Sequence, residues 1–251
     1  LLLMVVAHAA STLVMRRWLE GHLAERQALS GALLFASYPY FLALFYFQAG
    51  MAAGFALLFL LLTLLALDRD RFDLAALSLA AIALSHPPTF LIGGPAVLCY
   101  AFCLKGRRGW PVMISLAFAA GISSFYTLPA MLGREHFATE LFTAGKFDYR
   151  HNFFGIHETL CLPLLMLVPL GLLRAECSPD FRRFLFLAAA YASIMMLPVS
   201  RPLWDHLPLL ASLQFPGRFL LLFALLVPVC AVFCLNAPLS RAATLLVWLT
   251  T

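Results

Sequence analysis

Runs of about 20 consecutive apolar residues recur along this chain, and they restrict its fold more than any other feature. A helix needs roughly 17 to 25 such residues to cross the hydrocarbon core of a membrane. Five runs meet that requirement, namely residues 28–47, 51–67, 88–104, 111–132 and 216–235. The composition agrees, because 63% of the residues are hydrophobic and only 12% are charged. These patterns predict an all-α, polytopic transmembrane protein.

Other apolar segments fall short of a full span. The runs 159–173 and 184–199 have no charged residue inside them, and each end of the chain is predicted to be a truncated span. With these included, we expect about eight to ten membrane segments. We treat residues 1–251 as one transmembrane domain that is truncated at both ends.

The segment 74–84 is shorter still and leads into the sequence SHPP. Pro87 and Pro88 cannot continue the helix that precedes them, because proline lacks a backbone N–H and restricts the residue before it. We therefore predict a helical hairpin over residues 74–104 that is bent at His86. A deep re-entrant pair has the same periodicity and stays open as an alternative.

Lys and Arg are divided unevenly between the segments that connect the apolar runs. One set of segments carries 12 of the 17 basic residues, in RRWLEGHLAERQ, DRDRFD, KGRRG, RAECSPDFRR and Arg241. The other set has only Arg134, Lys146, Arg150, Arg201 and Arg218. Because basic residues are retained on the cytoplasmic side, the first set is predicted to be cytoplasmic and the second to face outward. The net charge of +5 then reflects topology, and no nucleic-acid partner is predicted.

Acidic residues and histidines also gather on the predicted outer side. They form four neighbouring pairs, Glu135 with His136, Asp148 with His151, His157 with Glu158, and Asp205 with His206. His86 is expected on the same side, whereas His22 is cytoplasmic and His8 lies in a span. Each residue alone fits an interfacial position wetted by headgroups, but their gathering favours a site. The segment 133–158 has six Phe and Tyr residues, so we predict a partly helical cap over that site.

The cysteines and the known enzyme motifs give little functional information. The chain has six cysteines, which we interpret mainly as small packing residues, and we predict no disulfide. Glycine-rich phosphate loops, GxSxG elbows and HExxH helices are absent from the sequence. No cofactor is predicted, although the outer histidines leave a divalent cation open because no pair has a diagnostic ligand spacing.

Several segments resemble one family in order and spacing. They are SYPYFLALFYFQAG, LALSHPPTFLIGGPA, FYTLPAMLGREHF, GKFDYRHNFFG and SRPLWDHLPLLASLQFPGRFL. They are similar to the bacterial integral membrane proteins called 6-pyruvoyl-tetrahydropterin synthase-related, which look like GT-C-type glycosyltransferases. The resemblance implies a GT-C-like fold in the bacterial inner membrane. It also implies transfer of a sugar from a polyprenyl-phosphate-linked donor to an envelope glycan, lipid or protein at the outer face.

The chain departs from this family at two positions. Gly217 stands where the family tends to have an aromatic residue, and Gln48 stands where it often has arginine. The resemblance also implies that the main catalytic carboxylate lies in an outer loop, which here is expected to precede Leu1.

Glycosyl transfer needs a carboxylate for the acceptor hydroxyl and cations for the leaving phosphate. The candidate carboxylates are Asp148, Glu158 and Asp205. The candidate substrate-binding residues are Arg218, Gln214, His86, Arg134, Arg150, His151, His206 and Gln48.

Arg218 has two interpretations. Pro216 begins the last complete span, so Arg218 lies near a helix N-terminus, where a phosphate is favoured and a guanidinium can bind it in a bidentate manner. Arg218 also fits an anchor that extends to the headgroups.

Two other functions stay open. A transporter or flippase for lipid-linked sugars would use broken helices, but its usual inverted repeat and mid-span charges are not evident. A non-catalytic scaffold derived from the GT-C fold fits the departures at Gln48 and Gly217.

Overall fold

A computed structural model describes residues 2–43, 50–133, 145, 148–153, 156–211 and 213–235, with the side chains of 108, 131, 156–160 and 208 excepted. These residues are helical with no strand among them. The α-helices are α1 (Leu2–Leu19), α2 (Glu25–Ala36), α3 (Pro39–Leu42), α4 (Met51–Asp68), α5 (Phe72–Ser85), α6 (Pro87–Lys105), α7 (Pro111–Leu132), α9 (Ile156–Leu165), α10 (Leu167–Leu173), α11 (Pro179–Met196), α12 (Arg201–His206), α13 (Pro208–Ala211) and α14 (Leu220–Leu235). Short 3₁₀ helices are η2 (Gly106–Gly109), η5 (Tyr149–His151), η6 (Pro198–Ser200) and η7 (Pro216–Phe219).

Five helical segments are long and apolar enough to cross a membrane. They are Leu2–Leu19, Met51–Asp68, Pro87–Lys105, Pro111–Ala130 and Pro216–Leu235. The pair Pro179–Met196 and Pro198–His206 passes the same test only jointly and is bent by 81°, which raises the number to six. The prediction of an all-α, polytopic membrane protein is therefore confirmed. Eight to ten segments and the likeness to GT-C enzymes stay predictions.

Prolines divide two of the apolar runs that the sequence alone presents as continuous. The run 28–47 is broken where α2 ends at Ala36 and Pro39 begins α3. The run 159–173 is broken at Met166, between α9 and α10. Pro169 has no N–H to donate to the carbonyl of the residue four positions earlier, so the helical ladder loses a bond at this break.

The predicted break at His86 is confirmed. His86 ends α5 and caps α6, with an extended backbone (φ −153°, ψ 87°). Its Nδ1 accepts hydrogen bonds from the backbone N of Thr89 at 3.3 Å and from the Thr89 hydroxyl at 2.8 Å. The imidazole thus satisfies a backbone N–H that would otherwise be unpaired at the helix start.

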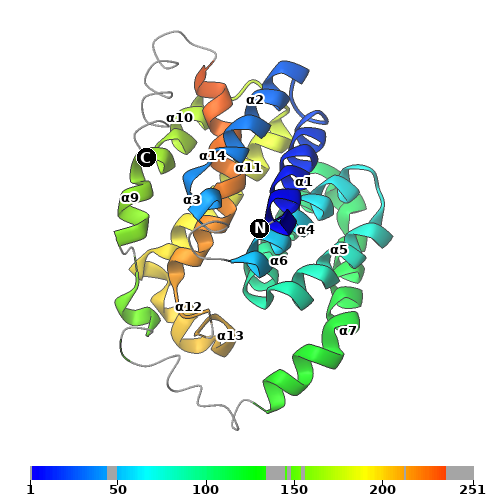
Figure 1. The fold of residues 1–251 in the computed structure, drawn as a ribbon, viewed down its shortest axis with the longest axis vertical. Helices are drawn as coiled ribbons and strands as arrows, with labels where there is room; N and C mark the ends of the chain where they lie inside the picture. The colour runs from blue at the N-terminus through cyan, green and yellow to red at the C-terminus, as the bar shows by residue number, and fades with distance from the viewer. Residues whose placement is uncertain are drawn as a thin grey trace.

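Helix α14 forms the centre of the bundle, with α9 and α10 on one side and α5 and α7 on the other (Figure 1). Every residue of α14 from Leu220 to Cys234 is buried, as expected for a helix that is apolar all round. Gly171 of α10 allows a close approach, because a Cβ there would lie 2.3 Å from the backbone oxygen of Cys230. All six cysteines are free, and Cys230 and Cys234 are buried packing residues.

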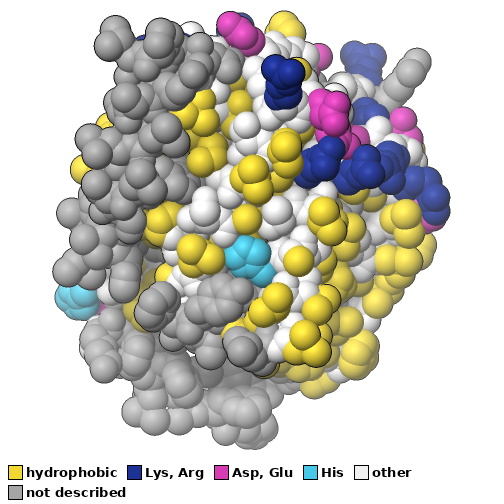
Figure 2. Space-filling view, turned by 45° about the horizontal axis from the view of Figure 1, so that its top comes forward, with side chains coloured by type: hydrophobic (Ala, Val, Ile, Leu, Met, Phe, Trp, Pro, Cys, Tyr) yellow, Lys and Arg dark blue, Asp and Glu magenta, His cyan; other side chains and the backbone are white. Residues whose placement is uncertain are grey.

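Four of the basic segments meet at one end of the bundle, which we call the basic end (residues 16–27, 68–73, 105–109 and 174–183). Contacts join Trp18 and His22 to Asp68, Tyr100 and Phe181 across this end. In Figure 2, Lys and Arg side chains gather with Asp and Glu toward the top of the molecule, above a surface with many hydrophobic side chains. The prediction that these four segments lie on the same side of the protein therefore agrees with the structure. Their cytoplasmic location stays a prediction.

Candidate functional site

A carboxylate with aromatic and cationic partners lies on α12, at the opposite end of the α11–α12 pair from Pro179. We call this group the Asp205 site; its members are Asp148, Tyr149, Arg150, Arg201 and Asp205. The Tyr149 hydroxyl donates a 2.5 Å hydrogen bond to Oδ1 of Asp205. Arg150 donates to the same oxygen from Nε at 3.4 Å and from Nη2 at 3.3 Å. Arg201 approaches the other oxygen, Oδ2, with its Nε at 3.6 Å.

A rigid aromatic support holds this site. The Tyr149 ring stacks on Trp204 with centroids 5.4 Å apart and an interplanar angle of 26°. Trp204 is fully buried and also contacts Phe153 and Phe219. Asp205 follows Trp204 directly on α12, so packing of the indole fixes the position of the carboxylate.

Asp148 has a local structural role. Its Oδ1 accepts a 2.9 Å hydrogen bond from the backbone N of Arg150 and caps η5. Its Oδ2 lies 3.8 Å from Nη1 of Arg150, and its carbonyl accepts a 2.7 Å hydrogen bond from the Asn152 side chain. Asp148 therefore shapes the turn that presents Tyr149 and Arg150 to Asp205.

Arg218 and Gln214 form a second polar group near the start of η7. Nη2 of Arg218 donates to Oε1 of Gln214 at 3.1 Å, and its guanidinium lies 5.8 Å from the centre of the Phe215 ring. Gln214 has a left-handed backbone (φ 66°), which turns the chain into η7. Arg218 is half-buried, and no carboxylate pairs with it among the described residues.

His86 lies close enough to Arg218 for their charges to interact. Burial and the nearby Arg218 charge lower the pKa of His86 to about 4. The ring is therefore neutral near pH 7, and because Nδ1 accepts from Thr89, its proton is on Nε2. Burial, followed by the hydrogen bond to Asp205, raises the pKa of Tyr149, so its hydroxyl stays a donor. Nδ1 of neutral His86 is already occupied by Thr89, so the hydrogen-bonding groups that His86 and Arg218 still offer are donors.

The structure unites only some of the predicted site residues. Asp148, Arg150 and Asp205 come together, and Arg218 pairs with Gln214 beside His86. His151 and His206 are exposed, and Nδ1 of His206 donates to the Pro202 carbonyl at 2.7 Å. Gln48, Arg134 and the Glu158 side chain lie outside the described residues, as does most of the predicted cap over 133–158.

Three residues at or below the Asp205 site were not predicted as site residues. Tyr149 was interpreted only as an aromatic residue of the predicted cap, and Trp204 was not singled out. Arg201 was counted only for its charge. The spacing of Arg201 and Asp205 is a usable signal, because residues four apart share one helix face. The pairing of Tyr149 with Asp205, 56 positions apart, has no sequence signal.

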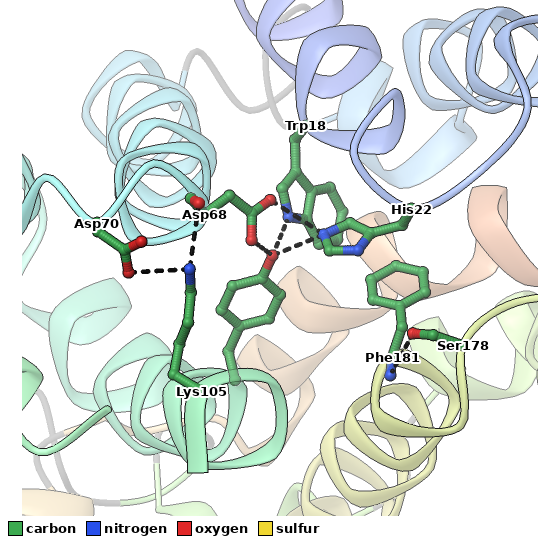
Figure 3. Close-up of polar contacts among 8 residues, drawn as sticks. Trp18, His22, Asp68, Asp70, Lys105, Ser178 and Phe181 are labelled. Carbon is green, nitrogen blue, oxygen red and sulfur yellow. Dashed lines mark hydrogen bonds and ion pairs between the residues drawn. The ribbon is translucent and has the colours of Figure 1, made fainter. Parts of the chain in front are cut away.

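A further polar cluster, also not predicted, lies at the basic end (Figure 3). Figure 3 shows Trp18, His22 and Asp68 directed toward one another, with Lys105 beside Asp68. Nε1 of Trp18 donates to the Tyr100 hydroxyl at 2.8 Å, and that hydroxyl donates to Oδ1 of Asp68. Nε2 of His22 lies 3.0 Å from Oδ2 of Asp68 and 2.8 Å from the Tyr100 oxygen.

The hydrogen bonds of this cluster determine that Nε2 of the His22 ring carries a proton. The only Tyr100 hydroxyl proton goes to Asp68, so both neighbours of His22 Nε2 are acceptors and that nitrogen carries a proton. The His22 ring also stacks on Phe181, with centroids 4.2 Å apart and an interplanar angle of 5°. Nε1 of Trp18, the Tyr100 hydroxyl, the Asp68 carboxylate and Nε2 of His22 all have partners, and the His22 side chain is only 9% exposed. The cluster therefore joins α1, α4, α6 and α11.

An apolar groove of about 350 Å³ runs between α9, α10, α11 and α14. Leu162 and Leu197 line it toward the Asp205 end, and Phe223 lines it from α14. Ser193 supplies the one hydroxyl among the lining residues that the structure describes. Phe186, another lining residue, is 60% exposed, so the groove opens on the side of the bundle. In a membrane this surface faces hydrocarbon chains.

No group of three or more His, Cys, Asp or Glu side chains is arranged to hold a metal ion within the part of the chain that the structure describes.

Comparisons with known proteins found no matching family model, curated protein or solved structure.

Proposed function

We propose that this protein is a membrane glycosyltransferase. It moves a sugar from a polyprenyl-phosphate-linked donor to an acceptor at the outer face of the bacterial inner membrane. In this reaction an acceptor oxygen bonds to the anomeric carbon, the bond from that carbon to the phosphate oxygen breaks, and the phosphate keeps the electron pair. The proton of the acceptor hydroxyl passes to a general base and from there to water.

The observation that carries the proposal is the state of Arg218. A half-buried guanidinium without a carboxylate partner among the described residues is costly unless an anion completes it. Its described neighbours Gln214 and Phe215 are neutral, and Tyr40, which also lies near enough to interact with its charge, is a phenol rather than a carboxylate. Together with the Nε2–H of His86, Arg218 supplies donors suited to the phosphate of a lipid-linked donor.

Asp205 is the carboxylate best placed to serve the acceptor. Its side chain is 32% exposed, whereas Asp148 is engaged in capping η5. Several donors on Oδ1 keep the carboxylate ionised, which makes it a weak base. It therefore suits orientation of an acceptor hydroxyl and stabilisation of positive charge on the sugar, and the strongest base is expected elsewhere in the full protein.

The lateral groove supports a lipid-linked substrate. The groove is almost wholly apolar. Phe223, which lines it, lies in the first turn of α14, directly after the 3₁₀ helix η7 that contains Arg218. A polyprenyl chain can enter such a groove from the side while its phosphate stays at the bundle end.

The test is transfer of a radiolabelled sugar from a polyprenyl-phosphate donor by the full-length protein in lipid vesicles. Wild type is compared with Arg218→Lys, Arg218→Ala and Asp205→Asn at matched expression and thermal stability. A bidentate phosphate contact needs the planar guanidinium, so Arg218→Lys should lose roughly 10- to 100-fold in rate. The control variant is Arg26→Lys, an exposed cation at the basic end.

Each outcome decides between functions. If Arg218→Lys keeps wild-type activity, Arg218 is an anchor for the helix and the phosphate role is wrong. If the wild type transfers no sugar but moves a fluorescent lipid-linked sugar between leaflets, the protein is a flippase. If it does neither, the scaffold interpretation replaces the enzyme.

A further inference from the structure

We propose that Tyr149 is a positioning residue that reserves one oxygen of Asp205 for a ligand hydroxyl. In this assignment Oδ1 of Asp205 is the structural oxygen and Oδ2 is the binding oxygen. The inference deepens the proposed function, on which its activity test rests, and its structural test does not depend on that function.

The two oxygens of Asp205 have different surroundings. Oδ1 takes the 2.5 Å bond from Tyr149 and the two longer bonds from Arg150. Among the described residues, Oδ2 has only the Nε of Arg201 nearby, at 3.6 Å and beyond good hydrogen-bond distance. An ionised carboxylate has about four acceptor positions, so Oδ2 keeps free capacity for a donor from a ligand.

Tyr149 is better suited than Arg150 to hold Oδ1. Tyr149 is only 8% exposed and its ring is stacked on the buried Trp204, so the hydroxyl cannot move far. The Arg150 side chain is 49% exposed, and its bonds to Oδ1 are longer. A short bond from a fixed donor restricts rotation of the carboxylate and directs Oδ2 consistently.

Hydrogen bonding by Tyr149 also favours the ionised carboxylate. Among the described residues, the charged or titratable groups that face Asp205 are Tyr149 and Arg150 from η5 and Arg201 from its own helix. Asp148 lies behind Arg150, and exposed His206 follows Asp205 in sequence. Arg150 and Arg201 remain in a Tyr149→Phe variant, which keeps the stacked ring and removes only the hydroxyl. Protonation of Asp205 should then occur at higher pH than in the wild type.

The test measures protonation and transfer separately, using full-length protein in lipid vesicles. Infrared difference spectra follow the protonated carboxyl band during an acid titration, and Asp205→Asn identifies the part of the band that belongs to Asp205. Transfer from the polyprenyl-phosphate sugar is measured from about pH 3 to about pH 8, so that the range includes the titration of a carboxyl. Tyr126→Phe is the matched control, because Tyr126 lies exposed on α7.

In Tyr149→Phe the Asp205 band should appear at higher pH, and the acid limb of the transfer profile should move to higher pH by the same shift. Tyr126→Phe should match the wild type in both measurements. An unchanged Asp205 band in Tyr149→Phe overturns the inference, whatever the activity. A shifted band without wild-type transfer would keep the positioning role and reject the proposed function.

Discussion

Nε1 of Trp18 donates a 2.8 Å hydrogen bond to the hydroxyl of Tyr100, which joins α1 to α6 across 82 positions of sequence. The same hydroxyl donates to Asp68 at the end of α4. Tyr100 is fully buried, so water cannot replace the hydroxyl if it is removed. One phenol oxygen thus fixes the relative positions of three helices at the basic end.

Tyr100→Phe should therefore destabilise the protein. The variant leaves Nε1 of Trp18 buried without an acceptor and removes one donor from Asp68, at a cost of roughly 1–3 kcal/mol. The measurement is the thermal unfolding temperature of the purified protein in detergent. Tyr126→Phe, on an exposed tyrosine, is the control and should leave the temperature unchanged. Equal unfolding temperatures for both variants would show that the Tyr100 bonds add no stability.

Apolar run length predicted the long helices well. The runs 51–67, 88–104 and 111–132 correspond to α4 (Met51–Asp68), α6 (Pro87–Lys105) and α7 (Pro111–Leu132). These helices have proline or glycine at their starts and apolar interiors, so local sequence alone determines their bounds. The breaks after Ala36 and at Met166 were not predicted, because hydrophobicity does not register the backbone bonds that a proline removes.

The candidate site was only partly predictable. Asp148, Arg150 and Asp205 were selected for their charge and for their predicted side of the membrane, both of which are read from the sequence alone. Which of them meet depends on packing of Tyr149 against Trp204, a contact between distant segments that leaves no periodic pattern. The network of Trp18, His22 and Asp68 was missed for the same reason.

Gly171 should tolerate no side chain. A Cβ there would lie 2.3 Å from the backbone oxygen of Cys230, and backbone cannot rotate away as a flexible side chain can. Gly171→Ala should force α10 from α14 and lower stability by about 1–3 kcal/mol. Gly121→Ala on α7, where a Cβ meets nothing within 4 Å, should be neutral or slightly stabilising in the same thermal unfolding assay. A stable Gly171→Ala would mean that the two helices are not closely packed there.

The basic end should face the cytoplasm. Arg69 is exposed at this end and Arg201 is exposed at the Asp205 site, so each can be replaced by cysteine with little effect on packing. In a Cys177→Ser background, a membrane-impermeant maleimide added to intact cells should label Arg201→Cys and not Arg69→Cys. Both positions should react after the cells are opened. Labelling of position 69 from outside would reverse the orientation and place the Asp205 site in the cytoplasm.

His86 should make stability sensitive to acid. Its pKa is lowered from 6.5 to about 4 in the folded protein, by burial and then by Arg218, whereas an unfolded chain has the ordinary value. Above pH 6.5 the ring is neutral in both the folded and the unfolded protein, so protonation of His86 takes nothing from the stability of the fold. As the pH falls from about 6.5 toward about 4, the unfolded chain binds a proton that the folded protein resists, and stability decreases.

His86→Asn keeps a side chain that can cap α6 but has no titrating ring. Its thermal unfolding temperature should therefore fall less between about pH 6.5 and about pH 4.5 than that of the wild type, whereas His206→Asn, on an exposed histidine, should follow the wild type. Identical acid slopes for wild type and His86→Asn would mean that His86 titrates at its ordinary pKa, and that its ring is not kept neutral by burial and by the Arg218 charge.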